Sequence, residues 1–404
     1  MMAELGARVL ATDAQERSVL AAVRCLSAAG AAVTAVGNTR EAPGLWSRTP
    51  TSRRLAPDLR RDTEGFLRRL EEILTRTPHD LLLAGTDAAL LVVSRQRDRL
   101  APHVELGLPS HETVQRCLDR EQLSLEAARV GLPAPEGRVC RAVEEALSAA
   151  RTFGYPVVVK PVRTVVEAEG AVRRHSAVLA HDDAAIESAA QALETCIVQR
   201  RVEGQVVSFA GVATDGGLLG FAVSRYARTW PPEAGNVCFS ETIACPPGLD
   251  ERVRALVDGL GWVGIFELEL IERPGLGLSA IDFNPRPYGS LSLAVAAGVP
   301  LSSLWAGWRL GRPTAQRASA RIGVRYRWED ADARHLLWQA RRGHVSSALA
   351  GAKPRRGVVH PYFQARDPGP VLARAAQLAR GAAGRARDGA NQHEEVRASR
   401  ERRN

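Results

Sequence analysis

Short apolar runs alternate with stretches of helical periodicity along the first hundred residues. The runs predict buried strands, and the stretches, in which apolar residues recur every three or four positions, predict amphipathic helices. The predicted strands cover residues 8–11, 32–36 and 80–84, and the predicted helices cover residues 16–29, 66–75 and 87–97. Strands and helices that alternate in this way form parallel sheets, so a doubly wound α/β domain is expected. No Gly-x-Gly-x-x-Gly follows the first strand, which gives a dinucleotide-binding role little support.

The pattern changes from residue 113 onwards. A helix is predicted over residues 113–130, followed by a break at residues 131–135 and a second helix over residues 142–153. Most of residues 157–282 have the alternation and turn residues of strands and hairpins, which indicates an α+β region. Its other expected features are a turn at residues 215–217 and a helix over residues 250–260.

The chain is expected to divide into three units, because a single core rarely serves 404 residues. The first is an α/β domain, and the second is an α+β domain with a small and a large subdomain. The third is rich in Arg and Ala, which predicts a helical C-terminal extension that is broken at residues 367–370 and ends in a disordered basic tail. The predicted bounds are 1–112, 113–312 (subdomains about 113–202 and 203–312) and 313–404.

Composition narrows the class of protein. No apolar run approaches the ~20 residues of a membrane-spanning helix, and residues 1–6 lack an export signal, so we expect a cytoplasmic protein with no membrane partner. The six cysteines lack paired metal-ligand spacing, which favours buried or incidental thiols over disulfides or zinc. Much of the net charge of +9 comes from the C-terminal end, where no aromatic residues interleave to stack on bases, so nucleic-acid binding is the weakest hypothesis.

Polar side chains recur on two otherwise apolar strands, residues 264–271 and 278–284, which a Pro-Gly turn joins. Alternation along a strand places Glu267 and Glu269 on one face of the first strand. It places Asp282 and Asn284 together on the second, and a hairpin brings the two rows side by side.

These oxygen donors indicate a metal site. Carboxylates on apolar strands are costly unless a cation or hydrogen bonds compensate them, and hard oxygen donors suit Mg²⁺ that bridges phosphates. An exposed sheet face with ordinary charges is the alternative. The run Asn284-Pro285-Arg286 argues against it, because it adds an oxygen donor and a cation directly beside the acids.

Lys160 follows the apolar strand formed by residues 155–159 and precedes Pro161. An ammonium group in this position can project into a cleft and act as a point charge on a phosphate. A snorkelling surface lysine is the alternative. Only Lys160 and Lys353 among the 54 basic residues are lysines, so a lysine at this place favours the functional interpretation.

In this order along the chain, Lys160, Glu269 and the run from Asp282 to Arg286 resemble the ATP-grasp superfamily. Within it, the chain is similar to the carbamoyl-phosphate-synthetase-like and biotin-carboxylase-like carboxylate–amine ligases. The resemblance covers roughly residues 5–312 and implies a Rossmann-like domain before the ATP-grasp domain. It also implies ATP and Mg²⁺, which Mn²⁺ could replace, as cofactors, small-molecule carboxylate and amine substrates, and it allows a homodimer.

The resemblance implies roles for individual residues. Glu269, Asp282 and Asn284 would hold the metal ions, and Arg286 would contact the transferred phosphoryl group or the acyl phosphate. Lys160 would hold the α- and β-phosphates. The remaining nucleotide contacts would come from Arg120, where most members have a lysine, and from the hinge residues Gln199, Arg200, Arg201 and Val202, whose backbone and first side chain would read the adenine edge.

Three departures from the family pattern stand out. After the hinge Gly204 the chain has Gln205 and Val206 where a glutamate usually binds the ribose, and Gln205 could supply those hydrogen bonds. The segment at residues 164–170, which usually forms a glycine-rich loop over the phosphates, contains one glycine. Asp282 replaces a usual glutamate, which shortens its reach by one methylene and bears on Mg²⁺ geometry.

The acceptor substrate is expected near residues 224–228 and the loop at residues 231–236, which precede the metal strands. Arg228 is the preferred candidate, because a guanidinium group matches either a carboxylate or a γ-phosphate. An exposed polar hairpin is the open alternative. The run Tyr288-Gly289-Ser290 is expected to shape the same cavity as a helix N-terminus suited to an anion.

The expected reaction is phosphoryl transfer from ATP to a carboxylate, which gives an acyl phosphate that an amine or similar nucleophile attacks, with release of ADP and phosphate. Lys160 and Arg286, with Arg228, are the residues expected to take part in catalysis. One alternative is an enzyme that phosphorylates bicarbonate or carbamate. The other is a nucleotide-binding module without turnover, which the altered ribose position and the glycine-poor loop permit.

Overall fold

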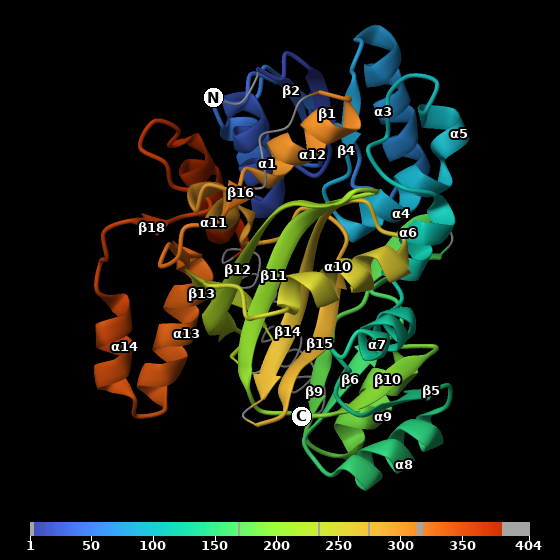
Figure 1. The fold of residues 1–404 in the computed structure, drawn as a ribbon, viewed down its shortest axis with the longest axis vertical. Coiled ribbons are helices and arrows are strands. Elements are labelled where there is room, and N and C mark those ends of the chain that lie inside the picture. The colour runs from blue at the N-terminus through green and yellow to red at the C-terminus, as the bar shows by residue number, and fades with distance from the viewer. Residues whose placement is uncertain (1–3, 169, 233–234, 274, 313–317, 382–404) are drawn as a thin grey trace, which may run out of the picture.

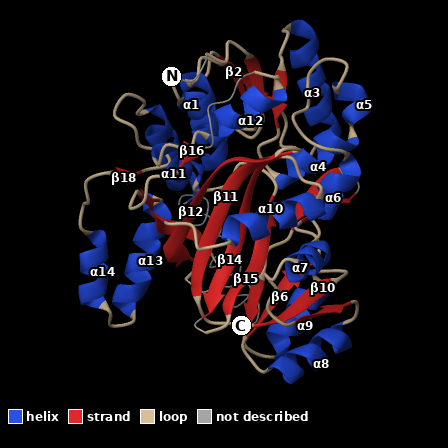
Figure 2. Ribbon diagram, in the orientation of Figure 1, coloured by secondary structure: helices blue, strands red, loops and turns tan. Residues whose placement is uncertain are grey.

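The computed structural model describes residues 4–168, 170–232, 235–273, 275–312 and 318–381. Figures 1 and 2 show three larger sheets: one near the N-terminus, a long central sheet and a small sheet beside it. None of the described helices is long and apolar enough to cross a bilayer.

The N-terminal sheet is parallel, with strand order β3-β2-β1-β4. Alternate side chains of its strands enter two different cores: Leu10 packs with α3 and α4, and Val9 packs with α1 and α12. Strand order reverses between β1 and β4, and ligands bind at such a switch point in α/β sheets. The elements are β1 (Arg8–Ala11), α1 (Arg17–Ala28), β2 (Ala32–Gly37), α2 (Pro43–Trp46), β3 (Ser52–Leu55), α3 (Thr63–Arg76), β4 (Leu81–Leu83), α4 (Asp87–Arg95), α5 (Arg97–Leu100) and α12 (Leu301–Arg309).

The helices and strands expected in this part of the chain are present, but β3 was not predicted. Its residues, Ser52 to Leu55, form an edge strand that is mostly exposed. An exposed edge strand needs no apolar run, so the sequence carries no strand signal there.

The small sheet is antiparallel, with strand order β5-β10-β6-β9, and α8 and α9 pack against it. The expected helix over residues 113–130 is wrong in one respect, because it is interrupted at Leu118–Asp119. The Asp119 carboxylate accepts hydrogen bonds from the backbone N–H groups of Glu121 and Gln122 and so starts a new helix. The elements are α6 (His111–Cys117), α7 (Arg120–Arg129), β5 (Gly137–Cys140), α8 (Val143–Phe153), β6 (Val157–Pro161), β7 (Val165–Ala168), β8 (Ala171–Arg174), β9 (Val178–Ala180), α9 (Asp183–Gln191) and β10 (Cys196–Arg200).

The central sheet has strand order β15-β14-β11-β12-β13-β17-β18, and β16 pairs with β12. The first five of these strands are antiparallel neighbours, as the hairpin pattern predicts. The elements are β11 (Gln205–Thr214), β12 (Gly217–Trp230), β13 (Asn236–Ile243), α10 (Leu249–Leu260), β14 (Gly264–Arg273), β15 (Gly277–Asn284), α11 (Leu291–Ala296), β16 (Ala318–Ser319), β17 (Arg325–Arg327), α13 (Glu329–Arg341), α14 (Val345–Ala352) and β18 (Val358–Val359).

The C-terminal region is not only helical, which corrects the expectation. Its helices α13 and α14 are present, but β16, β17 and β18 add three strands to the central sheet. In β17, Tyr326 is buried between Arg325 and Arg327, so the strand reads as polar although its central residue enters the core. The predicted basic tail, from residue 382 onwards, lies outside the described residues.

The N-terminal sheet and the central sheet share a core. Strand residues Val9 and Leu83 belong to the same buried cluster as Val212 of β11 and Ile265 of β14, and Trp305 of α12 lies between them. The relative position of the two sheets is therefore set by close packing.

A buried ion pair ties the C-terminal segment to the N-terminal domain. The Arg24 guanidinium donates to the Asp367 carboxylate at 2.9 and 3.0 Å and to the carbonyl groups of Pro361 and Tyr362. The same carboxylate accepts from the Ser47 hydroxyl at 2.6 Å. Both charged side chains are less than a tenth exposed.

Asp367→Ala is expected to lower the free energy of unfolding by about 3–5 kcal/mol, because it leaves the Arg24 charge buried without its partner. Urea unfolding at pH 7 measures the change. Asp258→Ala is the matched control, because it breaks the exposed Arg254–Asp258 pair and should leave stability nearly unchanged. Equal losses of stability in the two variants would contradict a stabilising role of the buried Arg24–Asp367 pair.

Candidate active site

The two polar rows lie opposite each other, as the sequence predicts. In the β14–β15 hairpin, Glu267 pairs with Asn284, and Glu269 pairs with Asp282. Immediately after Glu269 the register shifts, so that Leu270 faces Ala280 and Ile281 is left over as a bulge. The bulge frees the Ile281 carbonyl group, which accepts a hydrogen bond from Lys160 Nζ at 3.0 Å.

Tyr226 of β12 connects the two glutamates. Its hydroxyl lies 3.0 Å from Glu267 Oε1 and 2.9 Å from Glu269 Oε1. Ser208 also donates to Glu267, at 2.7 Å. A phenol has one hydrogen to donate, so without a cation one of the two carboxyl groups must supply the other proton.

The charge state of the glutamates agrees with this geometry. Burial, and then the neighbouring Glu267 and Asp282 carboxylates, raise the pKa of Glu269, and burial also raises the pKa of Glu267. Two adjacent carboxylates cannot both ionise cheaply in a buried site. The pair therefore favours either a shared proton or a cation.

Positive groups reach these acids from the small sheet and from α7. Arg120, the first residue of α7, donates to Asp282 Oδ1 and to the Pro161 carbonyl group, both at 3.0 Å. Burial lowers the pKa of Lys160 to about 8, although the Asp282 and Glu269 carboxylates oppose the shift. The small sheet and α7 thus place an ammonium and a guanidinium group beside two carboxylates.

Arg286, just beyond β15, is held by the N-terminal domain. Its Nε and one terminal nitrogen donate to the two Asp87 oxygens at 2.7 and 3.0 Å, and it also donates to the Asn284 side chain at 3.0 Å. Burial alone would raise the pKa of Asp87, but Arg286 lowers it, so the carboxylate stays ionised. Asp87 begins α4, 199 residues away in sequence, and was not among the predicted site residues.

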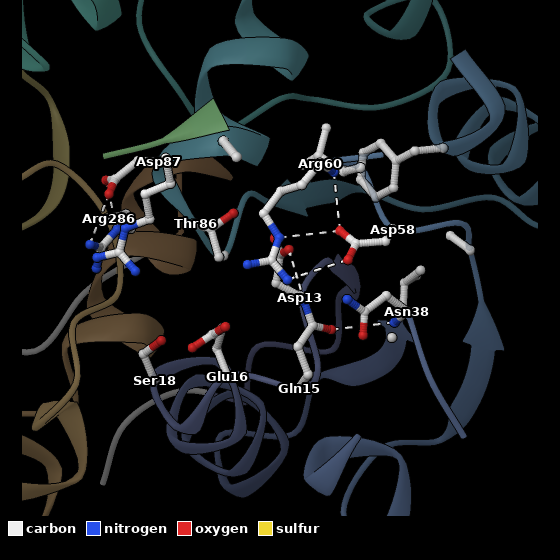
Figure 3. A pocket seen from close by; sticks show the side chains of 18 of the residues that line it. Asp13, Gln15, Glu16, Ser18, Asn38, Asp58, Arg60, Thr86, Asp87 and Arg286 are labelled. Carbon is white, nitrogen blue, oxygen red and sulfur yellow. Dashed lines mark hydrogen bonds and ion pairs between the residues drawn. The ribbon is translucent and has the colours of Figure 1, made fainter. Parts of the chain in front are cut away.

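Three cavities adjoin along this part of the molecule. The first, of about 470 Å³, lies between the small and central sheets, and the second, of about 200 Å³, lies over the acidic hairpin. The third, of about 160 Å³, lies in the N-terminal domain beside the Asp87–Arg286 pair (Figure 3). Glu269 and Asp282 line both the first and the second cavity.

The predicted hinge lines the first cavity. Gln199, Arg200, Arg201 and Val202 all contribute to its wall, together with Lys160 and Arg120. The Gln199 side chain is buried and donates to the Pro135 carbonyl group at 3.0 Å. Gln205 lies just outside this wall, where its side-chain amide donates to the Tyr226 carbonyl group.

Arg228 is not brought to the acidic hairpin. Its guanidinium donates to the buried Asp332 carboxylate of α13 at 2.5 and 3.1 Å and lies 4.3 Å from the Phe239 ring centroid. Register shifts on both sides of Arg228 turn its side chain away from the face that Tyr226 occupies. Tyr226, two residues earlier, is the residue of this strand that contacts the two glutamates.

The run from Tyr288 to Ser290 lies close to the site but is not a capped helix start. Ser290 precedes α11 without a side-chain capping bond, and Tyr288 is buried. Gly289 lines both the second and the third cavity, and its carbonyl group accepts from Arg17 Nε at 3.0 Å. Arg17 was not predicted, although its place at the start of α1, after a strand of a parallel sheet, is a usual position for a ligand-binding residue.

The described residues contain no group of three or more His, Cys, Asp or Glu side chains arranged to hold a metal ion. The oxygen donors at the hairpin are two opposed carboxylates and the Asn284 amide. Mg²⁺ usually keeps several waters and binds one or two carboxylates together with substrate phosphates. This donor set therefore suits a metal that arrives with a nucleotide better than a resident metal in a protein cage.

Comparison with known proteins finds a family match over α7 and the small sheet. Residues 119–207 match the family model of the carbamoyl-phosphate synthase L chain, ATP binding domain. The chain is 26% identical over 246 residues to the carbamoyl phosphate synthase large chain of Rubrobacter xylanophilus, in an alignment that covers 58% of this chain and 23% of that protein. The chain thus spans about a quarter of the length of this curated relative.

Two solved structures show the same fold. The L-amino acid ligase from Bacillus licheniformis aligns with a TM-score of 0.60 and 16% identity, over 77% of this chain and 75% of that chain. The biotin carboxylase domain dimer of the Hydrogenobacter thermophilus 2-oxoglutarate carboxylase, in complex with MgADP, ADP and bicarbonate, aligns with a TM-score of 0.60 and 14% identity, over 80% of this chain and 74% of that chain. The resemblance to the ATP-grasp carboxylate–amine ligases is confirmed.

Glu269→Gln is expected to flatten the pH dependence of stability in metal-free protein. Because burial raises the pKa of Glu269 above its ordinary value near 4.5, the wild type should lose stability as the pH rises above that value. The variant lacks this ionisation, so its free energy of unfolding should rise relative to that of the wild type from pH 5 to pH 8. Urea unfolding in the presence of a chelator at both pH values measures this difference.

Glu272→Gln is the control for this experiment, because Glu272 lies near the end of the same strand and is about half exposed. It should shift the stability equally at both pH values. If the stability of Glu269→Gln varied with pH in parallel with that of the wild type, the raised pKa of Glu269 would be contradicted.

Proposed function

We propose that this protein is an ATP-dependent ligase that activates a carboxylate as an acyl phosphate for attack by an amine. One observation carries the proposal: the opposed Glu269 and Asp282 carboxylates lie where the first cavity, between the small and central sheets, meets the second cavity, over the acidic hairpin. A nucleotide in the large cavity would direct its phosphates at these acids. The carboxylate substrate would then lie on the other side of them.

The nucleotide is proposed to bind between the small and central sheets. Backbone groups of Gln199 to Val202 would contact the adenine edge, and the apolar wall residues Val158 and Ile281 would cover the ring. Lys160 and Arg120 lie between this end and the acids, so they suit the α- and β-phosphates. Gln205 would need to release the Tyr226 carbonyl group before it could reach a ribose.

Mg²⁺ fits the acidic hairpin as the partner of a triphosphate. Glu269, Asp282 and Asn284 would hold it, and Tyr226 would orient the Glu269 carboxylate. The ion would supply charge neutralisation on the transferred phosphoryl group. Arg120, which now pairs with Asp282, is close enough to exchange this contact for a phosphate.

The protein's own work in the reaction is positioning and charge neutralisation. Asp87 binds two nitrogens of Arg286 and so fixes the orientation of the guanidinium plane toward the oxygens of an acyl phosphate. Lys160 neutralises the leaving diphosphate from the opposite side. Closure of the β7–β8 hairpin over the second cavity would exclude water from the acyl phosphate.

A second candidate function is phosphorylation of bicarbonate or carbamate. It is favoured by the match to a carbamoyl-phosphate synthase domain and by the likeness to a biotin carboxylase domain solved with bicarbonate. Stimulation of ATP cleavage by bicarbonate alone would select this candidate. Stimulation by organic carboxylates, with an amide as product, would select the first.

Lys160 should be protected from acylation by Mg-ATP. At pH 8 about half of its side chains are neutral, because burial lowers the pKa to about 8, so a small reagent such as acetic anhydride should modify it. Peptide mass spectrometry separates it from Lys353, the one other lysine, which is exposed and serves as an internal control. Equal labelling of Lys160 with and without Mg-ATP would contradict the nucleotide site.

Lys160→Ala and Glu269→Gln should each reduce ADP formation by about 10²-fold or more, because each removes a charge that contacts the phosphates or their metal. The assay incubates the protein with Mg-ATP and pooled carboxylates and amines, then measures ADP and product mass. Lys353→Ala should keep wild-type turnover. Unchanged turnover in either site variant would refute the assignment of that residue.

A further inference from the structure

The third cavity belongs to the N-terminal domain, but it opens onto the acidic hairpin. It lies at the switch point between β1 and β4, where the loops after these strands and the first turns of α1 and α4 meet (Figure 3). It shares six wall residues with the cavity over the hairpin: Arg17, Asp87, Arg174, Asn236, Arg286 and Gly289. A molecule bound here would reach the reacting centre past Arg286.

Opposite charges are balanced around this cavity. Its wall contains four carboxylates and four guanidinium groups, and two pairs of them are already joined: Asp87 with Arg286, and Asp58 with Arg60. The eight residues are Asp13, Glu16, Asp58, Asp87, Arg17, Arg60, Arg174 and Arg286. Such a wall suits a ligand that carries both signs, because a simple cation or a polyphosphate would meet as much repulsion as attraction.

Glu16 is the carboxylate best placed to receive a positive group. Its side chain makes no hydrogen bond or ion pair with the part of the chain that the structure describes, and it lies between the side chains of Ser18 and Gln15 in Figure 3. Glu16 directly precedes α1, next to Arg17. The Arg17 guanidinium is held against the Trp328 ring, 3.7 Å from its centroid, and by the Gly289 carbonyl group.

Asp13 marks the inner end of the cavity as a built site. It is buried and has a φ of +61°, in the left-handed region, where Asp and Asn are enriched among non-glycine residues. Thr12 donates to one carboxylate oxygen at 2.6 Å, and Gln15 donates to the other at 3.3 Å. Asn38 and the largely exposed Arg60 add two further polar groups to the wall.

The size and lining exclude several ligands. A cavity of about 160 Å³ is similar in volume to one that holds a benzene-sized molecule, so it suits a small ligand and not a dinucleotide. Its polar wall does not suit an apolar amine. A small zwitterion whose third group is also polar matches both the size and the charges.

We infer that this cavity binds the amine substrate and that this substrate is an α-amino acid with a polar side chain. The inference rests on the proposed ligase function. The ammonium group lies at Glu16, on the side of the cavity where Arg286 lies, and the α-carboxylate lies at Arg17 and Arg174. The side chain extends inward to Asn38 and Asp13.

This placement gives a balanced chemical step. The ammonium group gives one proton to the Glu16 carboxylate, and the freed lone pair forms the C–N bond to the acyl carbon. The C–O bond to phosphate then breaks, and its electron pair leaves on the phosphate. The phosphate takes the second proton from nitrogen, so the products are an amide, hydrogen phosphate and a protonated Glu16.

Hydroxylamine separates the two halves of the reaction, because it traps an acyl phosphate without needing a site for an amino acid. The wild-type protein is incubated with Mg-ATP, pooled carboxylates and either hydroxylamine or one of the twenty standard amino acids. Hydroxamate formation reports activation, and amide mass reports ligation. Polar amino acids are expected to give amide.

Glu16→Gln should reduce amide formation at least about 100-fold and leave hydroxamate formation within about twofold of the wild type. Asp13→Asn, which tolerates the same backbone conformation, should raise the KM for the amino acid and leave the KM for ATP unchanged. Glu112→Gln, an exposed glutamate in the first turn of α6, is the matched control and should change neither product.

The failures are distinguishable. Absence of hydroxamate in the wild type would overturn the proposed ligase function itself. Hydroxamate without amide from any amino acid would overturn the inference and leave the ligase function standing. Equal losses of hydroxamate and amide in Glu16→Gln would show that Glu16 does not act on the amine.

Discussion

The buried carboxylates of the β14–β15 hairpin are the constraint on which the rest of the site depends. Their ionised form is costly in the interior, so the fold must bring compensating positive charge from elsewhere in the chain. Arg120 comes from the start of α7 and Lys160 from the small sheet, and both reach the hairpin across the large cavity. These two cations do not fully neutralise the buried carboxylates. The remaining negative charge favours the binding of a nucleotide together with its metal ion.

The same principle explains how the N-terminal domain is coupled to the hairpin. Arg286 would be a mobile cation beside the acids if Asp87 did not hold two of its nitrogens. Asp87 can do this because the shared core of Val9, Ile265 and Trp305 packs the two sheets together. Packing of the shared core brings Asp87 within hydrogen-bond distance of Arg286, and the resulting ion pair orients the Arg286 guanidinium group.

Local patterns predicted the site only where its geometry is local. Period-two alternation around a Pro-Gly turn predicted that the two polar rows lie side by side, because a hairpin closes over a few residues, but it did not predict the bulge after Glu269. The Asp87–Arg286 and Arg228–Asp332 pairs join residues 199 and 104 positions apart, and no periodicity reports which cation meets which anion over such distances. Arg228 was assigned to the wrong surroundings for this reason, and β17 was missed because two arginines flank its one buried residue.

Arg286 links the two chemical halves of the cleft. Asp87 engages two of its nitrogens, one of these also donates to Asn284, and the third donates to the Pro287 carbonyl group, so a ligand can use only the remaining N–H of that third nitrogen. A substrate in the third cavity would lie against the same Asp87 that orients this guanidinium. Occupation of that cavity would thus act on the phosphoryl site through an existing ion pair, with no need for a change in the hairpin itself. In this arrangement the bound amine substrate is part of the environment in which the acyl phosphate forms. Phosphorylation of the carboxylate would then be favoured when the amine is already bound.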